Sequence, residues 1–287
     1  MPKLPPLPPT VIEPMVRRAL DEDFGNSGDI TANLLVPASA KGNLVMRSRE
    51  VGVIAGMQAA AMTYKMVDPS VKFTIKKHDG AKVKKGDIIA TISGPSRSLL
   101  SAERVALNFL GRMSGIATLT SAYVKAVKGT NVRIAATRKT TPGLRALEKR
   151  AVLAGEGHTH RESLAAAIMI KDNHIALAGG VDKALKTITK NADHMTRISV
   201  EVDTLTQLKK VLKYAPHVVL LDNMDAKTLT KAVALVDAYD GPRPTLEASG
   251  GVTLETVKGL AATGIDVISI GALTHSAPNF DIGMDAR

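Results

Sequence analysis

Hydrophobic and polar positions follow two different patterns, one before and one after Val132. In the first part, apolar residues spaced three or four apart predict helices, and shorter apolar runs predict strands. The predicted helices are Val11–Asp23, Met57–Met66 and Ser101–Val127, and the predicted strands are Leu44–Ile54 and Phe73–Ile92. Gly111 and Gly115 are expected to break or bend the last helix. This part is predicted to be an α+β unit, preceded by an extended polyproline-like arm at residues 2–9.

After Val132, short apolar runs alternate with helical patterns. The predicted strands are Val132–Ala136, Ala167–Ile170, Ile198–Val202, Val218–Leu221, Thr245–Ala248 and Val267–Ile270. The predicted helices are Gly143–Ala154, Val181–Thr189, Leu205–Tyr214, Ala226–Ala238 and Leu254–Thr263. This alternation predicts a parallel sheet with right-handed crossovers, closed or nearly closed as a barrel. A doubly wound open sheet is the alternative, but no Gly-rich dinucleotide fingerprint follows the first strand.

Polar or glycine residues follow every one of these predicted strands. The strand ends read Thr137-Arg138-Lys139, Lys171-Asp172-Asn173-His174, Glu201-Val202-Asp203, Asp222-Asn223, Ser249-Gly250-Gly251 and Gly271-Ala272-Leu273-Thr274-His275. In an α/β barrel the catalytic groups occupy the carboxyl ends of the strands. The glycine-rich ends belong to the last two strands, where barrels usually bind phosphate through backbone N–H groups.

Cations gather between Ile134 and Ile175. Those at strand and loop ends indicate an anion site, because few acidic residues stand beside them. They are Arg138, Lys139, Arg161 and Lys171. Three others, Arg145, Lys149 and Arg150, share a helical segment and are expected to form a solvated face. The carboxylates Glu201, Asp203 and Asp222 suit ribose hydroxyls or a hydrated Mg²⁺, or, alternatively, salt bridges to these cations.

Three features of the first part carry separate predictions. Arg104 falls in the first turn of the helix predicted to begin at Ser101, where the helix dipole disfavours a cation, so an acidic ligand or partner could hold it there. Asp29 or Thr31 is expected to cap a helix or hold a turn. Residues 79–87 are similar to the hairpin turn of a lipoyl or biotin carrier, but Gly80 and Gly86 are more simply turn residues with positive φ.

Composition bounds the class of protein. With 287 residues, 45% of them hydrophobic, the chain should be a globular protein of one large or two modest domains. No apolar run approaches the ~20 residues that span a bilayer, and the start lacks the apolar core of a signal peptide, so we expect a cytoplasmic protein with no membrane partner. The absence of cysteine excludes disulfides, thiolate metal sites and cysteine nucleophiles.

The net charge of +11 would suit a nucleic-acid-binding protein. However, aromatic residues make up only 3% of the chain, and no zinc-finger, RNP or KH signature is present, so we expect no nucleic-acid partner. Small anionic substrates would explain part of the excess charge equally well.

Several motifs identify a resemblance at this point. They are TRKTTPGLR from Thr137, His160-Arg161, IKDNH from Ile170, LDNM from Leu221, LEASGG from Leu246 and GALTHS from Gly271. Together they resemble the quinolinate phosphoribosyltransferase family. The resemblance runs from about Val16 to Asp285 and includes Gly28-Asp29-Ile30-Thr31 and Glu103-Arg104.

The resemblance implies a reaction in de novo NAD synthesis, in which quinolinate and phosphoribosyl pyrophosphate give nicotinate mononucleotide, pyrophosphate and CO₂, with Mg²⁺ as the cofactor. It implies an N-terminal α+β domain at residues 1–113, an incomplete (open) α/β barrel at 114–275, and a tail at 276–287 that packs back on the first domain. It also implies a homodimer or a higher homo-oligomer.

The resemblance further implies roles for individual residues. Arg138, Lys139, His160 and Arg161 would orient the two carboxylates of quinolinate, and Arg104 would reach the site of the adjacent subunit. Lys171 would hold phosphate oxygens, while Glu201 and Asp222 would bind ribose and Mg²⁺-linked groups, with Mg²⁺ contact direct or indirect. The 5′-phosphate would lie on Ser249, Gly250, Gly251, Gly271 and Ala272. Thr137, Ile270 and His275 complete the substrate-binding set, and Lys139, Lys171, Glu201 and Asp222 form the catalytic set.

Four positions depart from the family's usual pattern. Ala136 and Ala166 stand where Asp is common, and Glu156 and Thr159 replace Gly and Asn. These changes bear on the loop around His160 and on carboxylates that would orient the cations.

Three other functions compete with this one. The first is a related phosphoribosyltransferase-like protein associated with molybdenum transport, against which TTPGLR and IKDNH argue. The second is a Schiff-base aldolase that uses Lys171. The third is a nucleic-acid-binding protein, or a barrel that only binds anions.

Overall fold

The computed structural model describes residues 5–286 and divides into two compact units. Unit 1 comprises Met1–Ser121, Thr140–Glu156 and Ala272–Arg287, and unit 2 comprises Ala122–Lys139 and Gly157–Gly271. Of the expected polyproline arm, residues 2–4 lie outside the described part of the chain, and Pro9 already belongs to the first helix.

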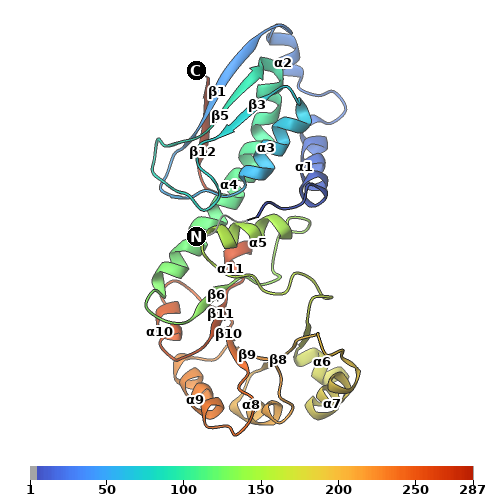
Figure 1. Ribbon diagram of the computed structural model, residues 1–287, viewed down its shortest axis with the longest axis vertical. Helices are drawn as coiled ribbons and strands as arrows, with labels where there is room; N and C mark the ends of the chain where they lie inside the picture. The colour runs from blue at the N-terminus through green and yellow to red at the C-terminus, as the bar shows by residue number, and fades with distance from the viewer. Residues whose placement is uncertain (1–4, 287) are drawn as a thin grey trace. The chain divides into compact units, whose positions relative to one another are not determined.

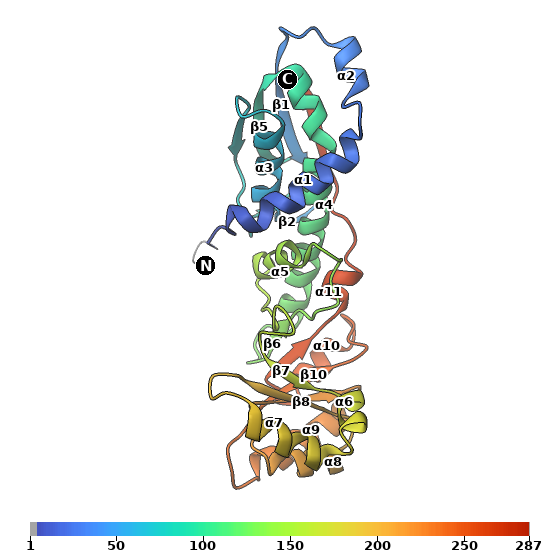
Figure 2. The same ribbon diagram turned by 90° about the vertical axis from the view of Figure 1, so that its right-hand side faces the viewer.

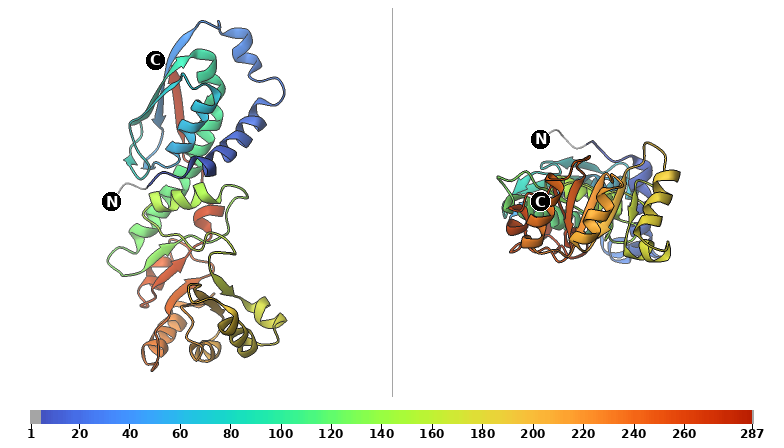
Figure 3. Two further views of the ribbon diagram at one scale, coloured as in Figure 1. Left: turned by 45° about the vertical axis from the view of Figure 1, so that its right-hand side comes forward. Right: turned by 90° about the horizontal axis from the view of Figure 1, so that it is seen from below.

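Unit 1 is built on a four-stranded antiparallel sheet. Its strand order is β12 (Ile282–Ala286), β1 (Lys41–Ser48), β5 (Ile88–Pro95) and β3 (Lys72–Ile75). The C-terminal strand therefore lies beside the first one, with Met46 paired to Met284 (Figure 3). The prediction of one strand over Leu44–Ile54 is wrong, because the chain leaves the sheet at Ser48. Residues Gly52–Val53 form β2, which pairs with β4 (Lys82–Val83) in a separate small sheet.

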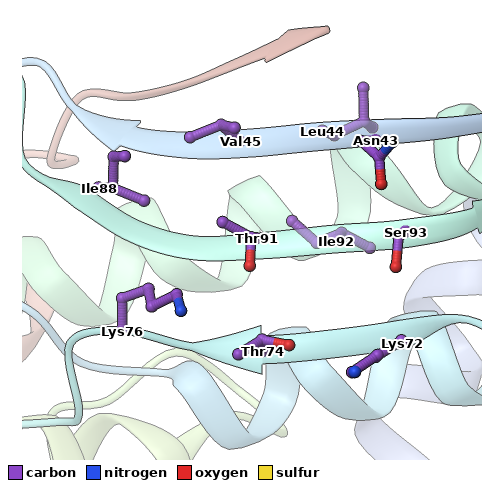
Figure 4. Close-up of a pocket in the computed structure, with 10 residues that line it drawn as sticks. All are labelled: Asn43, Leu44, Val45, Lys72, Thr74, Lys76, Ile88, Thr91, Ile92 and Ser93. Carbon is purple, nitrogen blue, oxygen red and sulfur yellow. The ribbon is translucent and has the colours of Figure 1, made fainter. Parts of the chain in front are cut away.

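Alternation along the strands gives this sheet one apolar and one polar face. Helices α3 (Met57–Val67) and α4 (Ser96–Ala126) cover the apolar face, where Met46, Ile92 and Tyr64 pack into the core (Figure 1). The opposite face carries Lys72 and Thr74 from β3, and Lys76 just after it, beside polar side chains of β5 (Figure 4). The remaining N-terminal helices are α1 (Pro9–Phe24) and α2 (Ile30–Leu35). As predicted, Asp29 caps α2, accepting a hydrogen bond of 2.8 Å from the Ala32 backbone N–H.

Helix α4 is continuous, so the expected break at Gly111 and Gly115 is wrong. The two glycines instead allow the C-terminal segment to approach the helix. A Cβ at Gly115 would overlap the carbonyl oxygen of Pro278, and the Phe280 N–H donates to the Gly111 carbonyl at 2.9 Å. The helix also begins at Ser96 instead of Ser101, so placing Arg104 in a first turn is wrong as well.

The cations of α5 (Arg145–Ala154) do not form the expected solvated face. Lys149 is only 2% exposed, and Arg150 Nε lies 3.8 Å from Asp79 Oδ2. Burial raises the pKa of the Asp79 carboxyl, an effect that the Arg150 charge opposes. On the same helix the fully buried Glu148 forms an ion pair of 2.9 Å with Arg112. The prediction failed because these charges are buried in pairs, which hydropathy alone does not reveal.

Unit 2 contains a six-stranded parallel sheet. The order is β6 (Arg133–Ala135), β11 (Val267–Ser269), β10 (Thr245–Ser249), β9 (Val218–Asp222), β8 (Ile198–Val202) and β7 (Ile168–Ile170). Because β6 and β7 are its two edges, the sheet is an open α/β barrel, which confirms the predicted fold class. His158 lies beside β6, where its N–H donates to the Ile134 carbonyl at 2.8 Å and its carbonyl accepts from Ala136 at 2.9 Å.

Helices on the outer side of this sheet connect its strands (Figure 2). They are α7 (Val181–Asn191), α8 (Leu205–Leu212), α9 (Ala226–Asp237) and α10 (Val257–Ala261). Their starts are capped as the sequence favours: Thr204 and Gln207 form a capping box, and Asp225 accepts from the Thr228 N–H at 2.7 Å. Two short helices were not predicted, α6 (Asp172–Leu177) directly after β7 and α11 (Ala272–His275) in unit 1. Across residues 5–286, no helix is long and apolar enough to cross a membrane.

Candidate active site

The strands of unit 2 place one layer of predicted site residues at the carboxyl end of the sheet. Side chains two positions apart face the same side of a strand, and Ala135, Ser199 and Glu247 line one cavity on the inner side. Two positions further toward the carboxyl end of the same strands, the side chains that face the same side are those of Thr137, Glu201 and Ser249. The same step leads to Lys171 after β7, Asp222 at the end of β9 and Gly271 after β11. The strand-end pattern in the sequence thus becomes one inward-facing layer.

Lys171 and Glu201 form a tight ion pair in this layer. Lys171 Nζ lies 2.6 Å from Glu201 Oε2, and the lysine side chain is 45% exposed whereas that of the glutamate is 10% exposed. The glutamate is thus the anchored partner, and the lysine presents its charge toward solvent. Such a pair holds a cation in one position without an added ligand.

Asp222 and the glycines after β10 form a second part of the layer. Asn223 donates to Asp222 Oδ2 at 2.7 Å, and its own N–H donates to the Ser249 carbonyl at 2.9 Å. Gly250 has a φ of 97°, and a Cβ there would overlap the Asn223 side-chain oxygen. The turn therefore requires glycine, and Asn223, which was not among the predicted site residues, shapes it. Exposed backbone N–H groups at such a turn suit a phosphate.

Two guanidinium groups lie close together beside this layer. Burial lowers the pKa of the Arg161 guanidinium, and the charge of Arg138 lowers it further. Arg138 Nε is buried and has no hydrogen-bond partner within the described chain. One guanidinium nitrogen of Arg161 donates to the Ala167 carbonyl at 2.9 Å. The two positive charges repel each other, and one of them has a buried N–H group without an acceptor. Both features favour the binding of an anion with several oxygens.

His160 faces Glu247, a residue that was not predicted as part of the site. His160 Nδ1 accepts from the Arg161 N–H at 2.8 Å, so the ring hydrogen resides on Nε2. That nitrogen lies 3.5 Å from Glu247 Oε1, on a residue that is only 4% exposed. The missed signal was the glutamate itself, which interrupts the apolar strand Thr245–Ala248 at an inward position.

The remaining predicted residues are less closely tied to this layer. Lys139 is exposed, and its N–H donates to Thr137 Oγ1 at 3.0 Å. Ile270 is buried and donates its N–H to the Ala135 carbonyl. Arg104, Ala272 and His275 belong to unit 1, where Arg104 is exposed on α4 and His275 Nδ1 lies 2.6 Å from Ser276 Oγ.

The carboxylates fit a shared Mg²⁺ site better than a site made by protein alone. No group of three or more His, Asp or Glu in residues 5–286 is arranged to hold a metal ion. Glu201 and Asp222 lie at the ends of the neighbouring strands β8 and β9. Mg²⁺ typically uses one or two carboxylates and completes its coordination with waters and substrate phosphates. These residues therefore fit an ion that binds together with a phosphorylated substrate.

Comparison with known proteins decides the family. The N-terminal domain profile of quinolinate phosphoribosyl transferase matches residues 29–114, and the C-terminal domain profile matches residues 116–285. The chain belongs to the quinolinate phosphoribosyltransferase family. A nicotinate-nucleotide pyrophosphorylase [carboxylating] of Mycobacterium leprae is 43% identical, with 94% of this chain and 95% of that protein covered. A mitochondrial quinolinate phosphoribosyltransferase [decarboxylating] of Nicotiana tabacum is 42% identical over 98% of this chain and 84% of its own length.

Solved structures agree with this membership. The nicotinate-nucleotide pyrophosphorylase of Ehrlichia chaffeensis superposes with a TM-score of 0.90 at 38% identity, covering 96% of this chain and 98% of that one. NadC from Streptococcus pyogenes gives a TM-score of 0.92 at 35% identity, with 99% of each chain covered. The family suggested by the motifs in the sequence is thereby confirmed.

Proposed function

We propose that this member of the quinolinate phosphoribosyltransferase family transfers phosphoribosyl from phosphoribosyl pyrophosphate to quinolinate. Nicotinate mononucleotide, pyrophosphate and CO₂ are the products, in de novo NAD biosynthesis. The observation that carries the proposal is the single inward-facing layer at the carboxyl end of the sheet, in which the Lys171–Glu201 pair and the Gly250 turn lie on one side of the same sheet.

Quinolinate is the substrate that suits the paired guanidiniums. It carries two adjacent carboxylates, and the neighbouring charges of Arg138 and Arg161 would each be offset by one of them. Arg138 Nε, buried without a partner, would gain a hydrogen bond on binding. Lys139 would add a flexible cation, and His160 would offer a hydrogen bond from its ring. These residues would set the ring nitrogen toward the ribose.

The phosphoribosyl group would lie over the glycine-rich end. Backbone N–H groups of Gly250, Gly251 and Gly271, with the Ser249 hydroxyl and Ala272, would hold the 5′-phosphate. Lys171 would bind phosphate oxygens. Glu201 and Asp222 would bind the ribose hydroxyls, and their negative charges would stabilise the positive charge that develops at C1. Mg²⁺ would be held near these carboxylates by the pyrophosphate and would neutralise its charge.

The chemistry itself requires few protein side chains once the two substrates are correctly positioned. The pyridine nitrogen forms a bond to C1 while the C1–oxygen bond breaks and pyrophosphate leaves. The nitrogen is then positively charged, so the carboxylate at C2 can leave as CO₂ while its electron pair stays on C2. A proton from water completes nicotinate mononucleotide. The protein's main contributions are orientation and exclusion of solvent.

We also propose that the active enzyme is a homodimer or higher homo-oligomer in which Arg104 enters the neighbouring subunit's site. Arg104 is exposed on α4, so its charge is accessible to a partner. Mixing Arg104→Ala chains with Lys139→Ala chains should restore activity, because a mixed oligomer contains one site with both residues intact. Mixed oligomers as inactive as their parents would contradict the shared site.

The direct test of the reaction is product formation by the purified protein with Mg²⁺ and phosphoribosyl pyrophosphate. Quinolinate, nicotinate and nicotinamide are supplied in separate reactions. Nicotinate mononucleotide from quinolinate alone supports the proposal. Product from nicotinate, or none from quinolinate in folded protein, would refute it.

A further inference from the structure

The cavity that Ala135, Ser199 and Glu247 line extends to the amino end of the same sheet in unit 2. Its volume is about 290 Å³, close to the lower limit of cavities that hold small-molecule ligands. Its lining includes the first residue of β6, β9, β10 and β11, together with the residues just before β7 and β8. These are Arg133, Val218, Thr245, Val267, Ala167 and Arg197. The cavity therefore reaches the amino ends of the strands, and its lining also includes His160 and Arg161, which are proposed to bind quinolinate.

Cations dominate the wall of this cavity. Arg133 and Arg197 both line it, and neither guanidinium has an ion pair or hydrogen bond with any residue in the range 5–286. His158 lies on the same wall, where burial and the charge of Arg133 lower its pKa. The one carboxylate on the lining, Glu247, already faces His160. The unpaired charge of the cavity is positive.

Two buried polar atoms on this wall have no hydrogen-bond partner among the described residues. Ser199 is 7% exposed, and its Oγ forms no hydrogen bond. Glu247 Oε1 also lacks a hydrogen bond, in a residue that is 4% exposed. Leaving such groups unsatisfied is unfavourable, so native proteins usually supply a partner. A hydroxyl can donate to an oxyanion, and a carboxylate can accept from a ligand hydroxyl.

We propose that this cavity binds a small phosphate monoester that carries a hydroxyl group. The phosphate lies between Arg133 and Arg197 and accepts from Ser199, and the ligand hydroxyl donates to Glu247. Arg133, Arg197 and Ser199 are not among the residues proposed for quinolinate or phosphoribosyl pyrophosphate. The proposed phosphate contacts therefore lie outside the proposed substrate site, which the cavity adjoins through His160 and Arg161.

Backbone amide resonances of Ser199 and Thr245 give a local readout of binding in the full-length protein. The probes are inorganic phosphate and glycerol 3-phosphate. Both should shift these resonances saturably, and glycerol 3-phosphate should bind more tightly because of its hydroxyls. The R133Q/R197Q double variant should need at least about tenfold more of either probe, because both charge-assisted contacts are lost. Ser199→Ala tests the same site without changing charge, and it should weaken binding by about fivefold through one lost hydrogen bond.

Two further variants separate this site from other causes. K209Q/K210Q removes the same charge from the exposed end of α8 and should bind both probes as the wild type does. Lys171→Ala, at the other end of the sheet, should also leave the Ser199 and Thr245 shifts unchanged. Absence of saturable shifts in the wild type would overturn the proposal. So would unweakened binding by R133Q/R197Q, or an equal loss in K209Q/K210Q or Lys171→Ala.

Discussion

The two ends of the parallel sheet in unit 2 are made by the same strands and the same alternation, yet they hold charge differently. At the carboxyl end, Lys171 is fixed by Glu201 at 2.6 Å, and Asp222 accepts from Asn223. At the amino end, Arg133 and Arg197 line a cavity without an ion-pair partner in residues 5–286. Paired charges with glycine turns suit chemistry that needs fixed positions. Unpaired cations beside unsatisfied buried atoms suit reversible binding.

The largest expected effect comes from breaking the Lys171–Glu201 pair. Lys171→Ala and Glu201→Gln should each reduce kcat/KM for phosphoribosyl pyrophosphate by about 10²–10³-fold, because preorganised charge at the reacting centre is lost. Steady-state kinetics measures this loss. Lys209→Gln, which removes an exposed lysine from α8, is the control and should stay within about twofold of wild type. Comparable activity in Lys171→Ala and wild type would show that the carboxyl end is not the catalytic one.

The next effect concerns the glycine turn. Gly250→Ala should raise the KM for phosphoribosyl pyrophosphate at least about tenfold and destabilise the protein by about 1–3 kcal/mol, because φ at this residue is 97° and the new methyl group would overlap the Asn223 side chain. Kinetics and urea unfolding measure the two effects. Gly259→Ala, in α10 with open space around it, is the matched control: it should leave the KM unchanged and should not destabilise the protein, because alanine is the better helix former. A normal KM in Gly250→Ala would remove the phosphate-binding role of the turn.

A smaller effect is expected at Glu156, which precedes the segment that carries His158 and His160 past β6. Its φ of 68° is left-handed, a region that favours glycine. Glu156→Gly should raise the free energy of unfolding by up to about 1 kcal/mol, since the strain of a side chain in this region is relieved. Lys213→Gly, at a φ of −61°, should instead lower it. Urea unfolding gives the free energy of unfolding of both variants. Equal destabilisation by the two substitutions would contradict the claim that the backbone of Glu156 is strained.

The smallest effect is a pH dependence that reports on the amino end. Burial and Arg133 lower the pKa of His158 below its usual 6.5, so at mildly acidic pH the unfolded chain binds this proton before the folded protein does. Stability from this group is present above pH 6.5 and is lost as pH falls through the lowered folded-state pKa. His158→Gln should therefore reduce the loss of stability between pH 7 and pH 5, and Arg133→Gln should reduce it partly. Urea midpoints at the two pH values measure this loss. If the pH dependence of the midpoint is the same in both variants as in the wild type, His158 does not contribute to it.

The sequence was most informative where local pattern alone decides structure. The strand Ile198–Val202 and the helix starts at Val181, Leu205 and Ala226 were predicted to the residue, because alternation and capping residues act locally. The polar residues at the strand ends predicted the layer of site residues. These residues converge at one end of the sheet because its strands are parallel.

Features that depend on contacts between distant residues were not predictable. Gly111 and Gly115 reduce helix propensity, yet α4 continues through them because the C-terminal segment packs there. Lys149 is buried and Arg150 pairs with Asp79, an environment that exists only in the folded chain. Glu247 and Asn223 joined the site only once neighbouring strands were in register. The family motifs implied roles for individual residues, which secondary-structure propensity cannot predict.

The central claim is that the carboxyl end of the sheet performs decarboxylating phosphoribosyl transfer. The most direct measurement follows quinolinate labelled at the 2-carboxylate and counts labelled CO₂ and nicotinate mononucleotide in the same reaction. We expect one CO₂ for each nucleotide formed by the wild type, with both products lost together in Lys171→Ala and retained in Lys209→Gln. CO₂ without nucleotide, nucleotide that keeps the label, or full turnover by Lys171→Ala would contradict the claim.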